Sequence, residues 1–164
     1  MCTVVFIPGK DQYYFASLRD EDTERPEATP PELYTGENLQ FLAPKDGLAG
    51  GTWLGINEIQ HVIILLNGAF EKHTPNNHYL KSRGLIVSEL LVAETPVNDW
   101  HVMDLSEIEP FTLVVWSGGN LYQLVWNGEQ KKQILLNANT SHIWSSSTLY
   151  NTEAKAQREK LFQQ

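Results

Sequence analysis

The chain has 164 residues, and its 12 Lys and Arg against 20 Asp and Glu give a formal net charge of −8 at pH 7. This acidic balance argues against nucleic acid as a partner, because binding to a phosphate backbone depends on clustered Lys and Arg. The single cysteine excludes an internal disulfide and agrees with a reducing compartment.

Length and apolar pattern predict one domain, residues 1–164, in a soluble cytoplasmic protein. A chain of this size buries roughly 70% of the surface that it exposes when unfolded, so a second domain is not required. Met1–Pro8 is apolar but has no basic flank and is too short for the core of a signal peptide. The longest aliphatic run, Val62–Leu66, is far short of a membrane span.

The first third of the chain predicts a hairpin followed by a long irregular segment. Thr3–Ile7 and Tyr13–Leu18 are rich in β-branched and aromatic residues, and they flank a turn at Lys10-Asp11 that follows Pro8-Gly9. The stretch from Asp20 to Lys45 is acidic and contains four prolines, so we expect an irregular excursion over the surface. Loops of this length are often functional.

Further strand patterns follow. Trp53–Asn57 and His61–Asn67 predict a strand pair, and the continuous apolar character of the second indicates a central strand that is buried on both faces. A three-stranded meander is predicted after residue 110, with turns at Gly118-Gly119 and Asn127-Gly128. Its strands are Phe111–Trp116, Leu121–Trp126 and Gln133–Asn137.

Two helices complete the prediction. Lys81–Ala93 has apolar residues at the spacing of a core-facing helix, although Gly84 weakens its start. Glu153–Phe162 is charged and rich in helix formers, with Asn151 or Thr152 as N-cap. Strands with helices between and after them predict an α+β layered fold, in which helices cover mostly antiparallel sheets.

Cys2 is the residue with the clearest chemical potential. Removal of Met1 would expose its thiol beside its own α-amine, and part of a free α-amine is neutral near pH 7.5 and can accept the thiol proton. The alternative is a small apolar residue buried in the first strand.

His73 and His78 lack the spacing and partners of a zinc site, so we expect solvated loop histidines and no metal or other cofactor.

Four segments in order resemble a known family: Met1-Cys2, Arg19-Asp20-Glu21 with Arg25-Pro26, Gly50-Gly51-Thr52-Trp53-Leu54-Gly55-Ile56, and Arg83-Gly84-Leu85-Ile86-Val87. The chain resembles the NRDE family, also called the transport and Golgi organisation 2 family, which is similar to N-terminal nucleophile (Ntn) hydrolases. The resemblance implies an Ntn-hydrolase-like layered sandwich that is shortened at its C-terminus, because family members are usually longer.

The resemblance also implies roles for four residues. Cys2 would be the nucleophile and its freed amine the base, while Arg19 would favour the thiolate and Asp20 would hold the ammonium. Asn67, just before Gly68, could offer its side-chain amide or a backbone N–H to an oxyanion. The alternatives are a surface salt bridge for Arg19 and Asp20 and an ordinary Asn-Gly turn for Asn67.

The sequence also departs from the family pattern. Leu18 stands where the name-giving motif has asparagine, and Ser145-Ser146 stands where members tend to carry Ser-Asn. These differences favour a site that has lost some of its polar groups.

Two functions are considered. The first hypothesis, which follows from the resemblance of the four segments, is an Ntn hydrolase that cleaves a non-peptide amide or acyl bond of a small-molecule substrate. The second is a non-catalytic carrier of a small ligand, haem or an acyl group, on the same fold. A shortened sandwich could expose an apolar face, so a homo-oligomer is an open expectation.

Overall fold

The computed structural model describes residues 3–19, 24–76, 78–148 and 150–163. Its smaller sheet consists of β1 (Thr3–Pro8), β2 (Tyr13–Leu18) and β10 (His142–Ser145). The larger sheet consists of β3 (Glu32–Thr35), β4 (Gln40–Ala43), β5 (Leu54–Asn57), β6 (Val62–Asn67), β7 (Phe111–Ser117), β8 (Asn120–Trp126) and β9 (Lys131–Leu136). The helices are α1 (Arg83–Leu91), α2 (Pro96–Val102) and α3 (Thr152–Phe162).

The two sheets have simple orders. The smaller runs β10-β1-β2, and the larger runs β3-β4-β5-β6-β7-β8-β9, so each strand of the larger sheet neighbours the one before it in the chain. Every strand pairing among the described residues is antiparallel. The predicted α+β class with antiparallel sheets is confirmed, as are the first hairpin, the strand pair and the meander.

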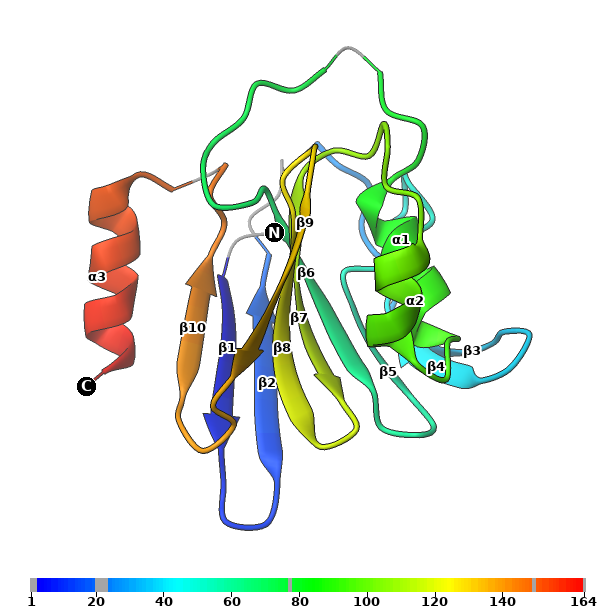
Figure 1. Cartoon of the computed structure of the whole chain (residues 1–164), viewed down its shortest axis with the longest axis horizontal. Helices are drawn as coiled ribbons and strands as arrows, with labels where there is room; N and C mark the ends of the chain where they lie inside the picture. Colours follow the sequence, from blue (N-terminus) through cyan, green and yellow to red (C-terminus); the bar gives the residue numbers. More distant parts are fainter. Residues whose placement is uncertain (1–2, 20–23, 77, 149, 164) are drawn as a thin grey trace.

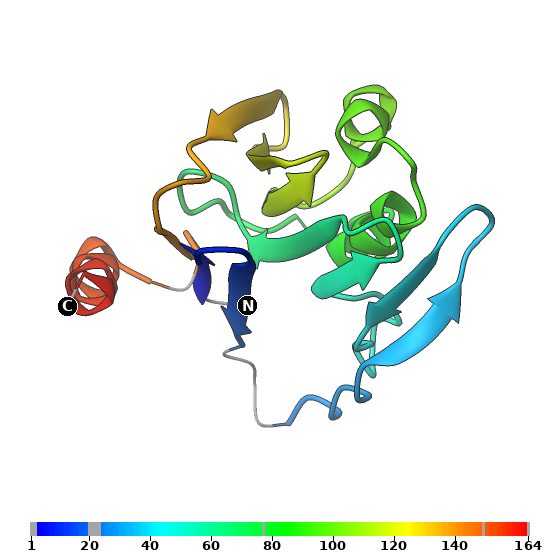
Figure 2. The same cartoon turned by 90° about the horizontal axis from the view of Figure 1, so that it is seen from below.

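The elements form layers, with α1 and α2 on one face of the larger sheet and the smaller sheet on the other (Figure 1, Figure 2). β6 lies in the middle and shows how the sequence produces this arrangement. Its Ile63 and Leu65 face the helices, and its Ile64 and Leu66 join the cluster with Val4 and Phe6 of β1. Alternate residues of a strand point to opposite faces, so an unbroken apolar strand is buried on both, as predicted.

The smaller sheet covers only part of its face of the larger one. Leu33, Leu42 and Ile56 are cross-strand neighbours on β3, β4 and β5, and they remain 65%, 44% and 42% exposed. Leu42 and Ile56 line an apolar depression of about 280 Å³ together with Phe15 of β2. Apolar burial is therefore continuous under the helices and incomplete at this end of the molecule.

Four elements, β3, β4, α2 and β10, differ from the sequence-based expectation. The segment from Asp20 to Lys45 contains β3 and β4, so the prediction of an irregular excursion was wrong for this hairpin, which a bond from the Gly36 N–H to the Leu39 carbonyl closes at 3.0 Å. The prolines of the segment lie outside both strands, where they break no ladder bond. The short elements α2 and β10 were not predicted.

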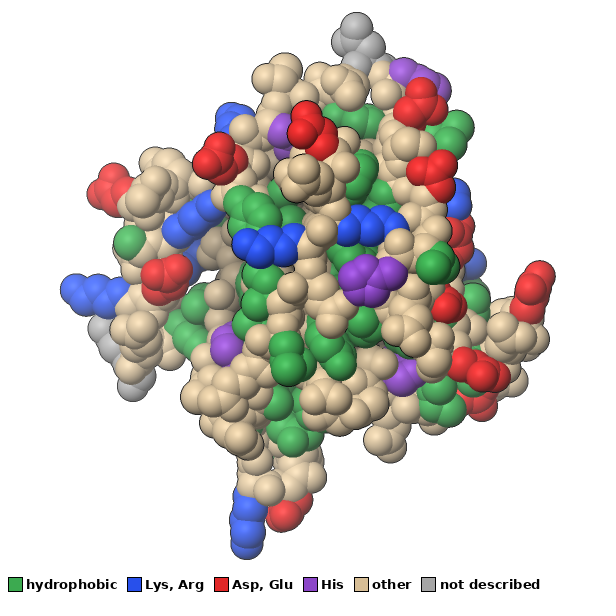
Figure 3. Space-filling view, viewed as in Figure 1, with side chains coloured by type: hydrophobic (Ala, Val, Ile, Leu, Met, Phe, Trp, Pro, Cys, Tyr) green, Lys and Arg blue, Asp and Glu red, His purple; other side chains and the backbone are tan. Residues whose placement is uncertain are grey.

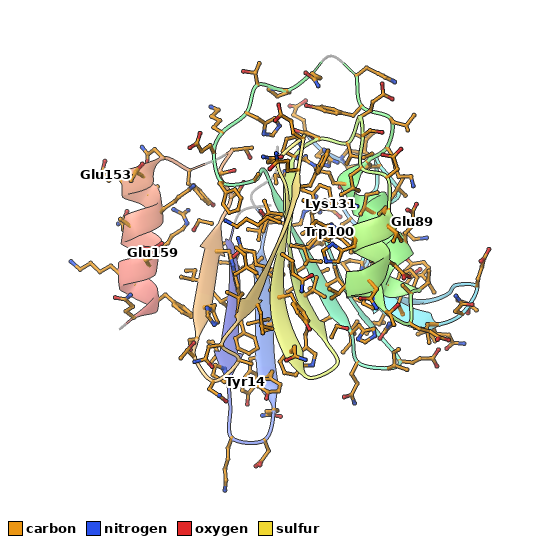
Figure 4. All side chains as sticks on the ribbon, viewed as in Figure 1. Tyr14, Glu89, Trp100, Lys131, Glu153 and Glu159 are labelled. Atoms are coloured by element: carbon orange, nitrogen blue, oxygen red, sulfur yellow. The ribbon has the colours of Figure 1, made fainter. Side chains whose placement is uncertain are left out.

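The helices begin and end for local reasons. Asn151 caps α3 by accepting from the Ala154 N–H, which settles which of the two predicted residues is the N-cap. Lys131 of β9 reaches the C-terminal end of α2, where its Nζ donates to the carbonyls of Trp100 at 2.6 Å and His101 at 2.9 Å (Figure 4).

The longest helix among the described residues has 11 residues, so none is long and apolar enough to cross a membrane.

Candidate functional site

A cavity of about 180 Å³ opens where four chain segments meet, and we call it the arginine pocket. Its wall includes Arg19 after β2, Asp46 from the β4–β5 connection, Asn67 at the end of β6 and Arg83 at the start of α1. The sheets bring these residues together although they are distant in the sequence.

Two of the four predicted site residues line this pocket together. Arg19 follows the last residue of β2, and Asn67 ends the central strand β6. Cys2 and Asp20 lie outside the described residues. Thr3, which is covalently joined to Cys2, is buried and pairs with Leu18, the residue before Arg19. The described parts of the predicted site therefore converge at one end of the sheets.

Asp46 organises one wall of the pocket and was missed by the sequence analysis. One carboxylate oxygen accepts from Arg19 Nη2 at 3.1 Å and from Arg25 Nε at 3.0 Å. The other accepts from Arg25 Nη2 at 2.9 Å and from the backbone N–H groups of Leu48 and Ala49. Burial alone would raise the pKa of Asp46, but these bonds outweigh it and hold that pKa well below its usual range.

Arg19 is fixed from a second side by an aromatic ring. Its guanidinium carbon lies 4.0 Å from the centroid of the Trp53 ring, within the range of a cation–π contact. With the bond to Asp46, the stacking holds a long and flexible side chain in one orientation. Arg19 is therefore part of a network within the pocket wall.

Two glycines explain how α1 comes so close to the pocket. A Cβ on Gly51 would lie 2.4 Å from the carbonyl carbon of Gly84 and 2.6 Å from the backbone nitrogen of Leu85. The Thr52 N–H donates to the Gly84 carbonyl at 3.1 Å across the same contact. The helix start and the β4–β5 connection thus touch backbone to backbone. Both glycines belong to the segments that carry the family resemblance.

Arg83 is held from behind the pocket. Its Nη2 lies 2.9 Å from Glu109 Oε2, and its Nη1 donates to the Pro110 carbonyl at 3.3 Å. The other oxygen of Glu109 lies 3.2 Å from His73 Nε2. The prediction of a solvated loop histidine was wrong for His73, because its side chain is only 18% exposed and contacts a carboxylate that the sequence places 36 residues away.

The whole sequence, residues 1–164, matches the transport and Golgi organisation 2 family. The chain belongs to this family. None of the curated proteins compared with the chain matches it.

The family membership makes the surroundings of Asn67 informative, because Ser146 stands where members tend to carry asparagine. Ser146 is buried, and its Oγ donates to the backbone carbonyl of Asn67 at 2.8 Å. The N–H of Gly68 is bound to the Pro110 carbonyl at 3.0 Å. In this member of the transport and Golgi organisation 2 family, the backbone carbonyl of Asn67 and the N–H of Gly68 are therefore both engaged in hydrogen bonds within the protein.

The polar groups of the pocket wall are mainly hydrogen-bond donors. Within the part of the chain that the structure describes, no three His, Cys, Asp or Glu side chains gather as metal ligands. The pocket instead offers guanidinium groups, an amide and hydroxyl groups, which bind and orient oxygen atoms.

Proposed function

We propose that the protein is an N-terminal nucleophile hydrolase that cleaves a non-peptide amide or a related acyl bond, with Cys2 as the nucleophile. The observation that carries this proposal is the meeting of Arg19 and Asn67 in one pocket, beside the strand that follows Cys2. These are the two described members of the site that the family resemblance implies. The small-molecule substrate would enter the arginine pocket.

The reaction would proceed in two stages. The freed α-amine of Cys2 takes the thiol proton, and the thiolate attacks the substrate carbonyl carbon to form a C–S bond. Arg19 favours the thiolate, Asp20 holds the resulting ammonium, and the Asn67 amide donates to the oxyanion. The ammonium returns its proton to the leaving group as the old acyl bond breaks. Water, activated by the same amine, then hydrolyses the thioester and restores Cys2.

The layering supports an Ntn-hydrolase-like sandwich. Two antiparallel sheets pack face to face through Val4 and Phe6 against Ile64 and Leu66, with α1 and α2 outside the larger sheet. α3 lies beside β10, at the opposite side of the molecule from α1 (Figure 1, Figure 2). We infer that this succession of layers, helices then larger sheet then smaller sheet, corresponds to the layers of an Ntn hydrolase that is shortened at its C-terminus.

The first test is the state and reactivity of Cys2 in the untagged protein. Intact mass before and after brief alkylation with iodoacetamide at pH 7.5 reports both the removal of Met1 and the modification of the single thiol. We expect a mass without Met1 and alkylation faster than that of free cysteine. Retained Met1 with slow alkylation would contradict a nucleophile at this position.

The second test is turnover of a panel of small amides and thioesters. Cys2→Ala should abolish hydrolysis while the melting temperature stays within the range of a surface substitution. Asp11→Asn, in the exposed β1–β2 turn, is the control and should keep full activity. Unchanged turnover in Cys2→Ala would sink the proposal.

The carrier hypothesis finds less support at this pocket. A haem or acyl group would need a largely apolar cavity, whereas Arg19, Arg25, Asp46, Asn67 and Arg83 line this one. A spectral titration with haem separates the two functions, since saturable binding at one equivalent would favour the carrier.

A further inference from the structure

We propose that the protein has a second binding site, at the N-terminal end of α3, which takes the oxyanion group of a small molecule, a phosphate or a carboxylate. The site is a cavity of about 620 Å³, which we call the α3 cavity. The β6–α1 connection contributes Phe70, Glu71 and Lys72 to its wall, and α3 contributes Thr152 and Lys155. The α3 cavity shares no described lining residue with the arginine pocket, so this inference is independent of the hydrolase proposal.

Ser147 gives the α3 cavity a buried hydroxyl group that has no partner among the described residues. Its side chain is only 7% exposed, and its Oγ makes no hydrogen bond within the described part of the chain. This Oγ lies directly over Gly68, where an added Cβ would be 2.2 Å away. Ser147 lines both the α3 cavity and an adjoining recess of about 190 Å³ that Gly68 borders. A buried hydroxyl without a partner lowers stability, and a bound oxyanion would accept its hydrogen bond.

The start of α3 adds backbone donors to the same cavity. Asn151 accepts from the N–H of Ala154, and the first helical bond uses the N–H of Lys155. The N–H groups of Thr152 and Glu153 therefore remain at the open end of this eleven-residue helix, where they carry partial positive charge. Glu153 is acidic, but its side chain is exposed and does not line the cavity. Helix ends of this kind bind phosphate and carboxylate groups.

Two lysines supply full positive charge. Lys72 lines the α3 cavity, and Lys155 lines both the cavity and the recess, and neither forms an ion pair with another described residue. Figure 3 shows Lys and Arg side chains, in blue, where α3 faces the rest of the molecule. Glu71 and Glu159 also border the two spaces, but both side chains are exposed, whereas Lys155 is partly buried. Charges in water are screened more than partly buried ones, so the lysine dominates.

The size of the cavity and one aromatic ring indicate the rest of the ligand. A volume of about 620 Å³ is more than a phosphate or carboxylate alone would fill. Phe70, which is 50% exposed, lines the cavity and gives it an apolar side. Apolar walls with a few placed polar groups are typical of sites for small molecules. The ligand is therefore a small molecule that joins an oxyanion group to an apolar part.

A titration with inorganic phosphate tests the site without knowledge of the ligand. The ¹⁵N-labelled protein is followed by amide chemical shifts at pH 7 and constant ionic strength. We expect the amide signals of Thr152 and Glu153 to shift and to saturate. Sodium acetate is the second probe: a lower half-saturation concentration for phosphate assigns a phosphate, and a lower one for acetate assigns a carboxylate. Shifts that never saturate, or that leave these two amides unmoved with both anions, would overturn the site and assign the Ser147 hydroxyl to bound water.

A pair of lysine variants on the same helix locates the charge. Lys155→Gln should raise the half-saturation concentration of phosphate about tenfold, because it removes a charge-assisted hydrogen bond. Lys160→Gln is the matched control, since Lys160 lies in the last turn of α3 and lines neither the cavity nor the recess. The control should leave the titration unchanged. Equal losses in the two variants would mean that phosphate responds only to overall charge, and would overturn the inference.

Ser147→Ala separates binding from folding. Without phosphate its melting temperature should equal or exceed that of the wild type, because a buried hydroxyl without a partner is removed. Added phosphate should raise the melting temperature of the wild type and that of the variant much less. Ser106→Ala, at an exposed position between α2 and β7, is the control and should respond to phosphate like the wild type. A Ser147→Ala protein with unchanged phosphate affinity would contradict the role of this hydroxyl.

Phenyl phosphate tests the apolar part of the ligand. It should saturate the same two amides at a lower concentration than inorganic phosphate, and Phe70→Ala should remove that advantage while leaving the affinity for inorganic phosphate unchanged. Equal affinities of the wild type for the two probes would overturn the apolar part of the inference.

Discussion

The helices α1 and α3 are of similar length and are stabilised in opposite ways. α1 has nine residues and buries five of them against β5 and β6. α3 has eleven residues, and none of its described side chains is buried. The first depends on tertiary packing, whereas the second depends on helix-forming residues and its Asn151 cap. Packing against the sheet therefore holds the start of α1 in place, and Arg83 at that start lines the arginine pocket.

The largest expected difference between the two helices comes from removing one leucine in each. Leu90→Ala in α1 should lower the free energy of unfolding by about 3 kcal/mol, because Leu90 is fully buried and its loss leaves a cavity. Leu161→Ala in α3 should cost no more than about 0.5 kcal/mol, because Leu161 is 62% exposed. Urea unfolding of both variants measures this. Equal losses would show that α3 is packed after all.

A methyl group between α1 and the sheet should have the next largest effect. Gly51→Ala forces the backbones of the β4–β5 connection and of α1 apart, and we expect a loss of about 2 kcal/mol. The same displacement moves Arg83 in the wall of the arginine pocket, so turnover of the panel of small amides and thioesters should fall as well. Leu48→Ala in the same connection is the control, because the Leu48 side chain is 69% exposed and does not line the pocket. We expect it to cause a smaller loss of stability and to leave turnover unchanged. A variant that kept both properties would refute the backbone contact.

Asp46 provides a smaller effect with a distinct pH dependence. Because its folded-state pKa is lowered, ionised Asp46 stabilises the native state above about pH 4, and this stabilisation is lost as the pH falls toward the lowered pKa. Asp46→Asn should therefore cost about 1.5 kcal/mol at pH 7 and progressively less below pH 4. Denaturant melts between pH 2.5 and 7 measure the difference, and Asp11→Asn serves as the exposed control. A difference that stayed constant with pH would contradict this role.

Local patterns in the sequence were enough for most of the fold. The apolar spacing around Leu90 and the unbroken run Val62–Leu66 predicted α1 and the central strand, since burial repeats with the period of each element. β3 and β4 were missed because Pro30 and Pro31 suggested a loop, although they only precede the hairpin. β10 is four residues long and gains its partner, β1, from the opposite end of the chain.

The site was predictable where a motif marks it and hidden where distant contacts create it. Arg19 and Asn67 were found from the family segments and from the end of a buried strand, and the structure places both on one pocket. Asp46 was not found, because its partners Arg25 and Arg19 lie 21 and 27 residues away in the sequence. Among the described residues, its only local signal is the bonding of its carboxylate to the next N–H groups, which is common in turns.

The contact between Gly51 and Gly84 also has a consequence for how this sequence can diverge. Neither position accepts a side chain unless the β4–β5 connection and α1 separate. A substitution at one glycine therefore needs a compensating change in the backbone around the other, or both glycines stay as they are. This constraint is independent of Cys2. A descendant that had lost its thiol would still need both glycines to close its core, and the pair is therefore a marker of ancestry rather than of activity.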